Sequence, residues 1–161
     1  MCFPLVNPNV RLKRSGAFTR LLFCAGSWKA LENNRDQWIQ ADLQTAHIIE
    51  SVTTLGGYVF DYTSKEYVKL YQVSYSQDGT RWEEIPKLFD GNEQPWTRKT
   101  NLLPERIVAR FIRLSPYSWS NRINMRFDVT GCAVQGRMSL VRMLSFLLQL
   151  GYLAVVYYFK K

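Results

Sequence analysis

The sequence predicts an all-β protein, built as an antiparallel sandwich, a jelly roll or a barrel. Aromatic residues make up 14% of the 161 residues, and they fit pleated, half-buried strands better than helices. Short runs of alternating apolar and polar residues follow one another, with turn residues between them. No stretch before residue 138 keeps a 3.6-residue apolar period over three turns. In a chain of about one domain, short strands without helices favour these three architectures.

The first three strands are expected at 37–43, 47–55 and 67–76. In the first run, three apolar residues alternate with polar ones, so one face should be buried; they are Ile39, Ala41 and Leu43. The third run alternates over its whole length, and one of its faces carries Tyr67, Lys69, Tyr71, Val73 and Tyr75.

An Asp78-Gly79 pair lies between the runs 71–76 and 82–85. Asp-Gly is typical of a two-residue hairpin, because both central residues of that turn need a positive φ. The sequence therefore predicts antiparallel pairing of these two strands around a tight turn.

A central strand is expected at 107–114. It is apolar on both faces apart from Arg110 and Arg113, as in a strand inside a sandwich. Because an arginine on such a strand needs a partner, we expect an ion pair, either Asp42 with Arg113 or Arg110 with Asp128. A last alternating run follows at 125–129 and ends at Gly131-Cys132.

The composition changes after Cys132. Residues 143–159 form a run of seventeen residues without a charge, bracketed by Arg142 and Lys160-Lys161. As a helix this run would be roughly 25 Å long, against about 30 Å for the hydrocarbon core of a bilayer. The pattern predicts an apolar helical tail at 133–161, which is either a membrane anchor or a helix docked on the sheet.

The residues that carry chemistry are scarce. A single histidine, His47, excludes a His-rich metal site, and the three cysteines have no C-x-x-C spacing. The glycine-rich phosphate loops and the zinc-protease and serine-hydrolase motifs are all absent from the sequence. The sequence thus disfavours an enzyme and predicts neither a metal nor a cofactor.

Charge is distributed unevenly along the chain. The formal net charge is +8, yet residues 31–97 hold five basic and eleven acidic side chains. This division predicts oppositely charged regions instead of one basic face, so we expect no nucleic-acid partner.

Several motifs, in order, resemble the discoidin domain, also known as the coagulation factor type C domain. They are TRLLFCAGSW at 19–28, NNRDQWIQADL at 33–43, YVKLYQVSYSQDGTRW at 67–82, FDGN at 89–92, IVARFIRLSPYSW at 107–119 and MRFDVTGC at 125–132. The resemblance implies an antiparallel jelly-roll β-sandwich of the galactose-binding-like type over residues 19–132. It also implies an extracellular setting and loops at one end that bind sugars, anionic lipid head groups or surface proteins.

The resemblance also bears on the first residues. The family has an opening cysteine, a strand and a long loop before the TRL motif, whereas residues 1–18 are too few for all of these, so we expect a truncated or remodelled segment. In the family the opening cysteine is bonded to that of the closing G-C, which makes Cys2 the expected partner of Cys132. Cys24 has no counterpart in the pattern and is expected to be a buried thiol.

One loop is the main candidate for ligand contact. The resemblance places a ligand loop at 56–66, where Tyr58, Phe60 and Tyr62 would be exposed anchors and Lys65 would meet an anionic group. The alternative is that these aromatics face the core. Trp28 closes a turn near the same end and is a further candidate, with core packing again as the alternative.

Other conspicuous residues are expected to serve the fold. Three tryptophans lie inside or beside strands and should be buried; they are Trp38, Trp82 and Trp119. Asp90-Gly91-Asn92 predicts a turn, with a calcium loop as the alternative.

The sequence therefore predicts a non-catalytic recognition module that binds cell-surface glycans or extracellular proteins, in cell adhesion or cell-surface binding. The alternatives are an anionic-phospholipid binder and an accessory domain of a larger enzyme. Residues 1–18 show no export signal, which suggests a fragment or a cytosolic chain, whereas the resemblance implies an extracellular or cell-surface location with membrane contact through 143–159.

Overall fold

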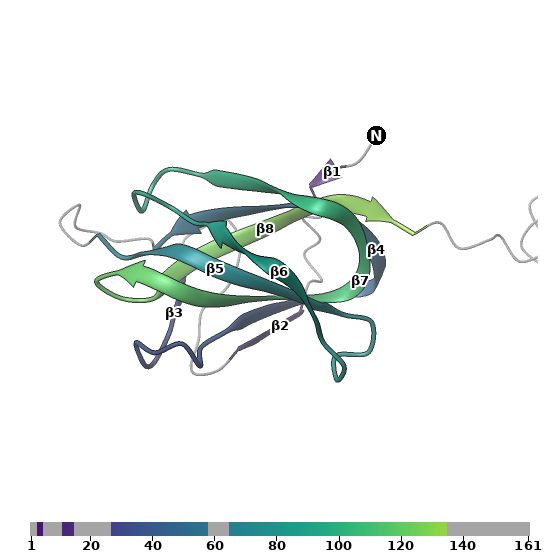
Figure 1. Cartoon of the computed structure of the whole chain (residues 1–161), viewed down its shortest axis with the longest axis horizontal. Helices are drawn as coiled ribbons and strands as arrows, with labels where there is room; N and C mark the ends of the chain where they lie inside the picture. Colours follow the sequence, from purple (N-terminus) through teal and green to yellow (C-terminus); the bar gives the residue numbers. More distant parts are fainter. Residues whose placement is uncertain (1–2, 5–10, 15–26, 58–64, 135–161) are drawn as a thin grey trace, which may run out of the picture.

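The computed structural model describes residues 27–57 and 65–134, together with the backbone of 3–4 and 11–14 (Figure 1). These residues form eight strands: β1 (Phe3–Pro4), β2 (Arg11–Arg14), β3 (Trp28–Lys29), β4 (Ile39–Gly56), β5 (Tyr67–Ser76), β6 (Glu83–Asp90), β7 (Lys99–Ser120) and β8 (Asn124–Ala133). Every pairing between them is antiparallel. The described residues thus confirm the all-β prediction.

Two long strands each take part in both layers of the sandwich. Residues 39–42 of β4 pair with β2 and with 111–114 of β7, whereas residues 47–54 pair with 99–109 of β7. The first layer is completed by β5 and β6, which continue from the last part of β7, and the second by β8, which lies beside β4. Figure 1 shows β7 turning over from one layer to the other.

The bend in β4 has a local cause. Its register against β7 shifts between Asp42 and His47, and Gln44 adopts a left-handed φ of 71°. Such a break in the ladder bends a strand and redirects it. The runs predicted separately at 37–43 and 47–55 are therefore one strand that changes layer.

The core lies between the two layers. Ile39, Ala41 and Leu43 are all buried, as the alternation predicted. The largest fully buried side chains are Trp28, Tyr71, Phe89, Ile39, Ile49, Ile112, Leu114, Ile123 and Met125. Each such side chain contributes about 1.5–3 kcal/mol through burial, so this cluster supplies most of the driving force for folding.

The predicted face of β5 is correct only in part. Tyr71 and Val73 are fully buried, but Lys69 is exposed. The register of β5 against β7 shifts on both sides of Leu70. Because side chains alternate with a period of two, these shifts change which residues face the core.

The predicted antiparallel pairing of β5 with β6 is confirmed, but the predicted tight turn is wrong. Tyr75 pairs with Glu83, so a longer loop joins β5 to β6, and only Gly79 of the pair has a positive φ, of 76°. The Asp78 carboxylate accepts hydrogen bonds from the main-chain N–H groups of Thr80 and Arg81, at 2.8 and 2.9 Å. These bonds hold the pKa of Asp78 well below its usual range.

The central position predicted for 107–114 is confirmed, because β7 lies between β4 and β5. One of its faces is not buried, however, since Val108 is 44% exposed. Neither expected ion pair forms. Instead the Arg110 guanidinium donates to both carboxylate oxygens of Asp42, at 2.8 and 2.9 Å.

Arg113 has other partners. Its guanidinium lies over the rings of Trp38 and Trp82, at 4.2 and 3.8 Å from their centroids, and donates to Gln40 Oε1 at 3.0 Å. Burial lowers the pKa of Arg113. The two tryptophans are half-buried and pack on this arginine, so their role is structural, as predicted, although their burial is incomplete.

Two predictions concern the ends of the chain. Cys132 is disulfide-bonded, whereas Cys2 and Cys24 lie outside the described residues. In the part of the chain that the structure describes, no helix is long and apolar enough to cross a membrane. The predicted tail lies outside that part.

Candidate functional site

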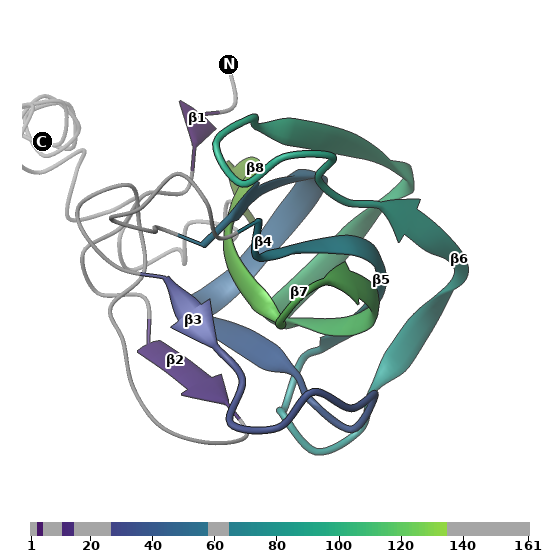
Figure 2. The same cartoon turned by 90° about the vertical axis from the view of Figure 1, so that its left-hand side faces the viewer.

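Connections between strands gather at one end of the sandwich, which we call the loop end. Among the described residues they are 30–38 between β3 and β4, Gly57 and 65–66 at the two ends of the connection between β4 and β5, 91–98 between β6 and β7, and 121–123 between β7 and β8. Figure 2 views the molecule from this end. At the opposite end, which we call the bend end, β4 and β7 pass from one layer to the other without a break.

The loop between β4 and β5 leaves and returns at one fixed point. The main-chain N–H of Gly57 donates to the carbonyl of Glu66 at 3.1 Å. A Cβ on Gly57 would lie only 2.0 Å from the side chain of Asn124. Only glycine fits this close approach, so the base of the loop is packed directly against the start of β8.

Glu66 is the centre of the hydrogen bonds at this base. Its carboxylate accepts from Lys29 Nζ of β3, at 2.9–3.0 Å, and from Asn124 Nδ2 of β8, at 3.0 Å. Burial acts to raise the pKa of Glu66, but the bonds from Lys29 and Asn124 and the nearby positive charges outweigh it and lower that pKa. Glu66 therefore ties the loop base to two other strands.

The turn at 121–123 is fixed from the neighbouring loop. Asn33 Nδ2 donates to the carbonyl of Asn121, and Asn33 Oδ1 accepts the N–H of Ile123, both at 2.8 Å. Asn121 has a left-handed φ of 53°. One asparagine thus holds two connections of the loop end together and leaves Arg122 exposed between them.

The residues predicted to contact ligand have different positions. Lys65 is exposed where the loop rejoins β5. Trp28 is only 1% exposed and belongs to the core, which corrects its assignment as a ligand contact and supports the packing alternative. Tyr58, Phe60 and Tyr62 lie outside the described residues.

The segment Asp90-Gly91-Asn92 was predicted as a turn, with calcium binding as the alternative. The N–H groups of Gly91 and Asn92 donate to the carbonyls of Lys69 and Val68, at 2.6 and 2.8 Å. These bonds hold the segment against β5. Within the described residues, no group of three or more His, Cys, Asp or Glu side chains could hold a metal ion.

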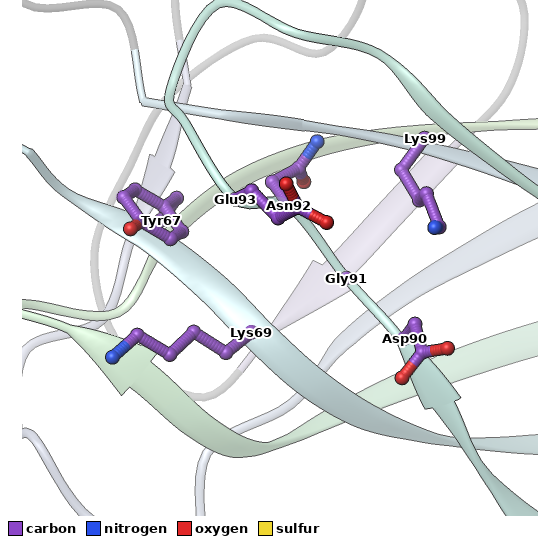
Figure 3. Close-up of a pocket in the computed structure, with 7 residues that line it drawn as sticks. All are labelled: Tyr67, Lys69, Asp90, Gly91, Asn92, Glu93 and Lys99. Atoms are coloured by element: carbon purple, nitrogen blue, oxygen red, sulfur yellow. The ribbon is translucent and has the colours of Figure 1, made fainter.

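A pocket of about 430 Å³ opens on the flank beside this segment (Figure 3). We call it the flank pocket, and it is lined by Tyr67, Lys69, Asp90, Gly91, Asn92, Glu93 and Lys99. The pocket could not be predicted from the sequence, because its residues come from three strands and the connection after β6. The Asp-Gly-Asn turn was the one signal that pointed to this place.

The loop end therefore combines a firmly held loop base, exposed cations and a polar pocket on its flank. This arrangement offers hydrogen-bond donors and acceptors to a ligand. It is suited to recognition, in which polar groups are placed by a rigid framework.

Comparison with known proteins gives a match over most of the sandwich. The family model of the F5/8 type C domain matches residues 17–129. Human neuropilin-1 is 33% identical over 121 residues, which cover 72% of this chain and 13% of that protein. Lactadherin of Rattus norvegicus is 33% identical over 111 residues, covering 66% of this chain and 26% of that protein. The chain thus spans well under two thirds of the length of these relatives.

Solved structures show the same fold. Discoidin II of Dictyostelium discoideum superposes with a TM-score of 0.70 at 18% identity, covering 86% of this chain and 62% of that one. A CBM32 module of Clostridium perfringens, solved in complex with GalNAc-β-1,3-galactose, gives a TM-score of 0.61 at 14% identity and covers 83% and 100%. At such identities the likeness establishes the fold alone, and it confirms the predicted galactose-binding-like sandwich.

Proposed function

Because the chain belongs to the F5/8 type C, or discoidin, domain family, we propose that it is a non-catalytic recognition module that acts outside the cell or at its surface. Its ligand is a carbohydrate or a surface protein, bound by connections at the loop end. Domains of this family are binding modules for carbohydrates, phospholipids or proteins.

One observation carries this proposal, namely the fixed base of the loop between β4 and β5. Gly57 and Glu66 are hydrogen-bonded to each other, and Glu66 is bonded to Lys29 and Asn124. The sequence between them, YVFDYTSK, carries three aromatic residues. Aromatic rings on a held loop give a large contact area at a small entropic cost, which suits both sugar stacking and protein contact.

Charge at the loop base favours these ligands over an anionic membrane. Lys29 is neutralised by Glu66, while Lys65 and Arg122 are exposed. A membrane surface attracts clusters of basic side chains, each of which contributes about 1 kcal/mol. The other exposed cations of the described loop end, Arg35 and Arg98, share their connections with exposed acids, namely Glu32, Asp36 and Glu93. The excess of basic charge is therefore small, and the phospholipid ligand ranks second.

The test is to replace Tyr58 and Phe60 together by Ser in the full chain. We expect capture on a glycan array, or of a surface-protein ligand, to be lost, while the melting temperature changes by only a few degrees. If instead the two rings belonged to the core, their removal would cost about 3–5 kcal/mol each and the domain would unfold. A collapsed melting transition would therefore exclude the loop as the ligand site.

A matched control is Leu102→Ser, which removes a 76% exposed apolar side chain of β7 outside the connections of the loop end and should leave capture intact. Vesicles containing phosphatidylserine test the second ligand. Binding to them that is strong at low salt and lost at high salt would favour the phospholipid, since neutral-sugar binding should hardly depend on salt.

A further inference from the structure

The flank pocket lies beside the loop end and is formed by the start of β5, the end of β6 and the start of β7. Figure 3 shows Lys69 and Lys99 on opposite sides of the segment Gly91-Asn92-Glu93. Its volume of about 430 Å³ falls within the range of small-molecule sites. The pocket is thus large enough to hold a small ligand.

The charges that line this pocket cancel. Lys69 and Lys99 are balanced by Asp90 and Glu93, and no ion pair between described residues joins any of the four. A pocket built for phosphate or sulfate would carry an excess of positive charge. Separated charges of both signs instead offer hydrogen-bond donors and acceptors to an uncharged polar ligand.

Asn92 supplies an acceptor that the fold leaves unused. Its side chain is buried, and Nδ2 donates to the carbonyls of Thr54 and Thr97. Those two bonds fix the orientation of the amide, and Oδ1 is left buried with no hydrogen-bond partner in the structure. A buried carbonyl oxygen without a donor is costly, so a donor that enters the pocket is favoured there.

We infer that the flank pocket is a binding site for a neutral saccharide, separate from the loop at 58–64. A sugar hydroxyl both donates and accepts hydrogen bonds. It can therefore donate to Asn92 Oδ1 or a carboxylate while it accepts from a lysine. Tyr67 also lines the pocket, with 9% of its surface exposed. The inference goes beyond the proposed function, because it names a second site and its ligand.

The test follows the main-chain amides of the pocket by NMR. The full chain, labelled with nitrogen-15, is titrated with D-galactose and with N-acetyl-D-galactosamine, and in a parallel titration with inorganic phosphate. We expect at least one sugar to shift the Gly91, Asn92 and Glu93 resonances in a saturable way, and phosphate to leave them unchanged.

Three variants locate the effect. Asp90→Ala combined with Glu93→Ala removes two exposed acceptors and should weaken sugar binding by about tenfold. Glu84→Ala removes an exposed carboxylate of β6 outside the pocket and should change nothing. Tyr58→Ser with Phe60→Ser should also leave these resonances responsive. Melting curves for each variant confirm that it is folded.

Two results would overturn the inference. The first is that neither sugar moves the pocket resonances, in which case the proposed function is still judged by capture through the loop at 58–64. The second is that phosphate binds and is lost on Lys69→Ala with Lys99→Ala, which would assign an anionic ligand. Loss of glycan capture in the Tyr58→Ser with Phe60→Ser variant tests the loop at 58–64 alone, because in that variant the pocket is judged by its own amide resonances.

Discussion

The bend end and the loop end of the sandwich hold the two layers together in different ways. At the bend end, the layers are joined by strands that do not stop, and the carboxylate of Asp42 accepts from Arg110 and from the N–H of Gln44, at 2.8–2.9 Å. At the loop end, separate connections join the strands, and hydrogen bonds of the Glu66 and Asn33 side chains hold these connections in place.

The two ends also differ in how completely their polar groups are satisfied. Among the described residues, the buried side-chain atoms without a hydrogen-bond partner are Trp28 Nε1, Thr54 Oγ1, Asn92 Oδ1, Asn124 Oδ1 and Arg113 Nε. All but the last belong to residues at or beside the loop end. Such groups are rare in native proteins because each costs about 1–3 kcal/mol. Buried polar atoms without a partner are therefore concentrated at the loop end, where each of them lowers the stability of the fold.

The largest effect should come from the disulfide of Cys132, which lies on β8 opposite Ile48 near the bend end. Phe3 pairs with Gly131 and Pro4 with Thr130, so β1 lies beside the part of β8 that carries Cys132. Together with the family pattern this supports a Cys2–Cys132 bond. Cys2→Ser should then lower the free energy of unfolding by about 4–5 kcal/mol in the chain-entropy model, as measured by urea denaturation.

Cys24→Ser is the control and should leave the disulfide in place. Non-reducing peptide mapping decides between the two partners. A peptide that joins Cys24 to Cys132 would contradict this assignment.

The next effect concerns Trp28, a residue at the loop end that belongs to the core. Trp28→Ala should destabilise the fold by about 3–5 kcal/mol, whereas Leu31→Ala, three residues along and 69% exposed, should cost less than about 0.5 kcal/mol. Chemical denaturation of both variants measures the difference. Equal, small effects would show that Trp28 is not a core residue and would restore it as a ligand candidate.

The sequence could predict elements but not their partners. Alternation located the buried face of 39–43, and the family motifs predicted the sandwich. The two predicted ion pairs were wrong because the register between strands determines which side chains lie opposite one another. Arg113 lies opposite Gln40, and Arg110 falls in the register shift that follows Asp42, so it reaches the carboxylate that the sequence had assigned as one possible partner of Arg113.

The candidate site was harder to predict for a related reason. Glu66 meets Lys29 and Asn124 from 37 and 58 residues away, and no local pattern encodes such a contact. The paired glycines at 56–57 were a usable signal, since a Cβ at Gly57 would collide with Asn124. The flank pocket likewise exists only once β5, β6 and β7 are placed together.

The smallest expected effect on stability is that of a substitution at Glu66. Its carboxylate is 12% exposed and Lys29 is 45% exposed, so Glu66→Gln should reduce the free energy of unfolding by about 1 kcal/mol at neutral pH. Because the folded state lowers the pKa of Glu66 from 4.5, this contribution is complete above that value and is lost as the pH falls through the folded pKa. Denaturation at several pH values should show the wild-type advantage shrinking only in acid.

Asp42→Asn makes the same change of carboxylate to amide at the bend end and separates stability from recognition. It should destabilise the fold through the loss of the ion pair with Arg110 and of the bond from Arg110 to Oδ2 but leave ligand capture unchanged. Glu66→Gln should weaken capture even under conditions where the protein is fully folded, because the loop base loses its ion pair with β3. If both variants lowered capture only in proportion to their stability, the loop end would have no special role in recognition. Capture measured well below both melting temperatures distinguishes these outcomes.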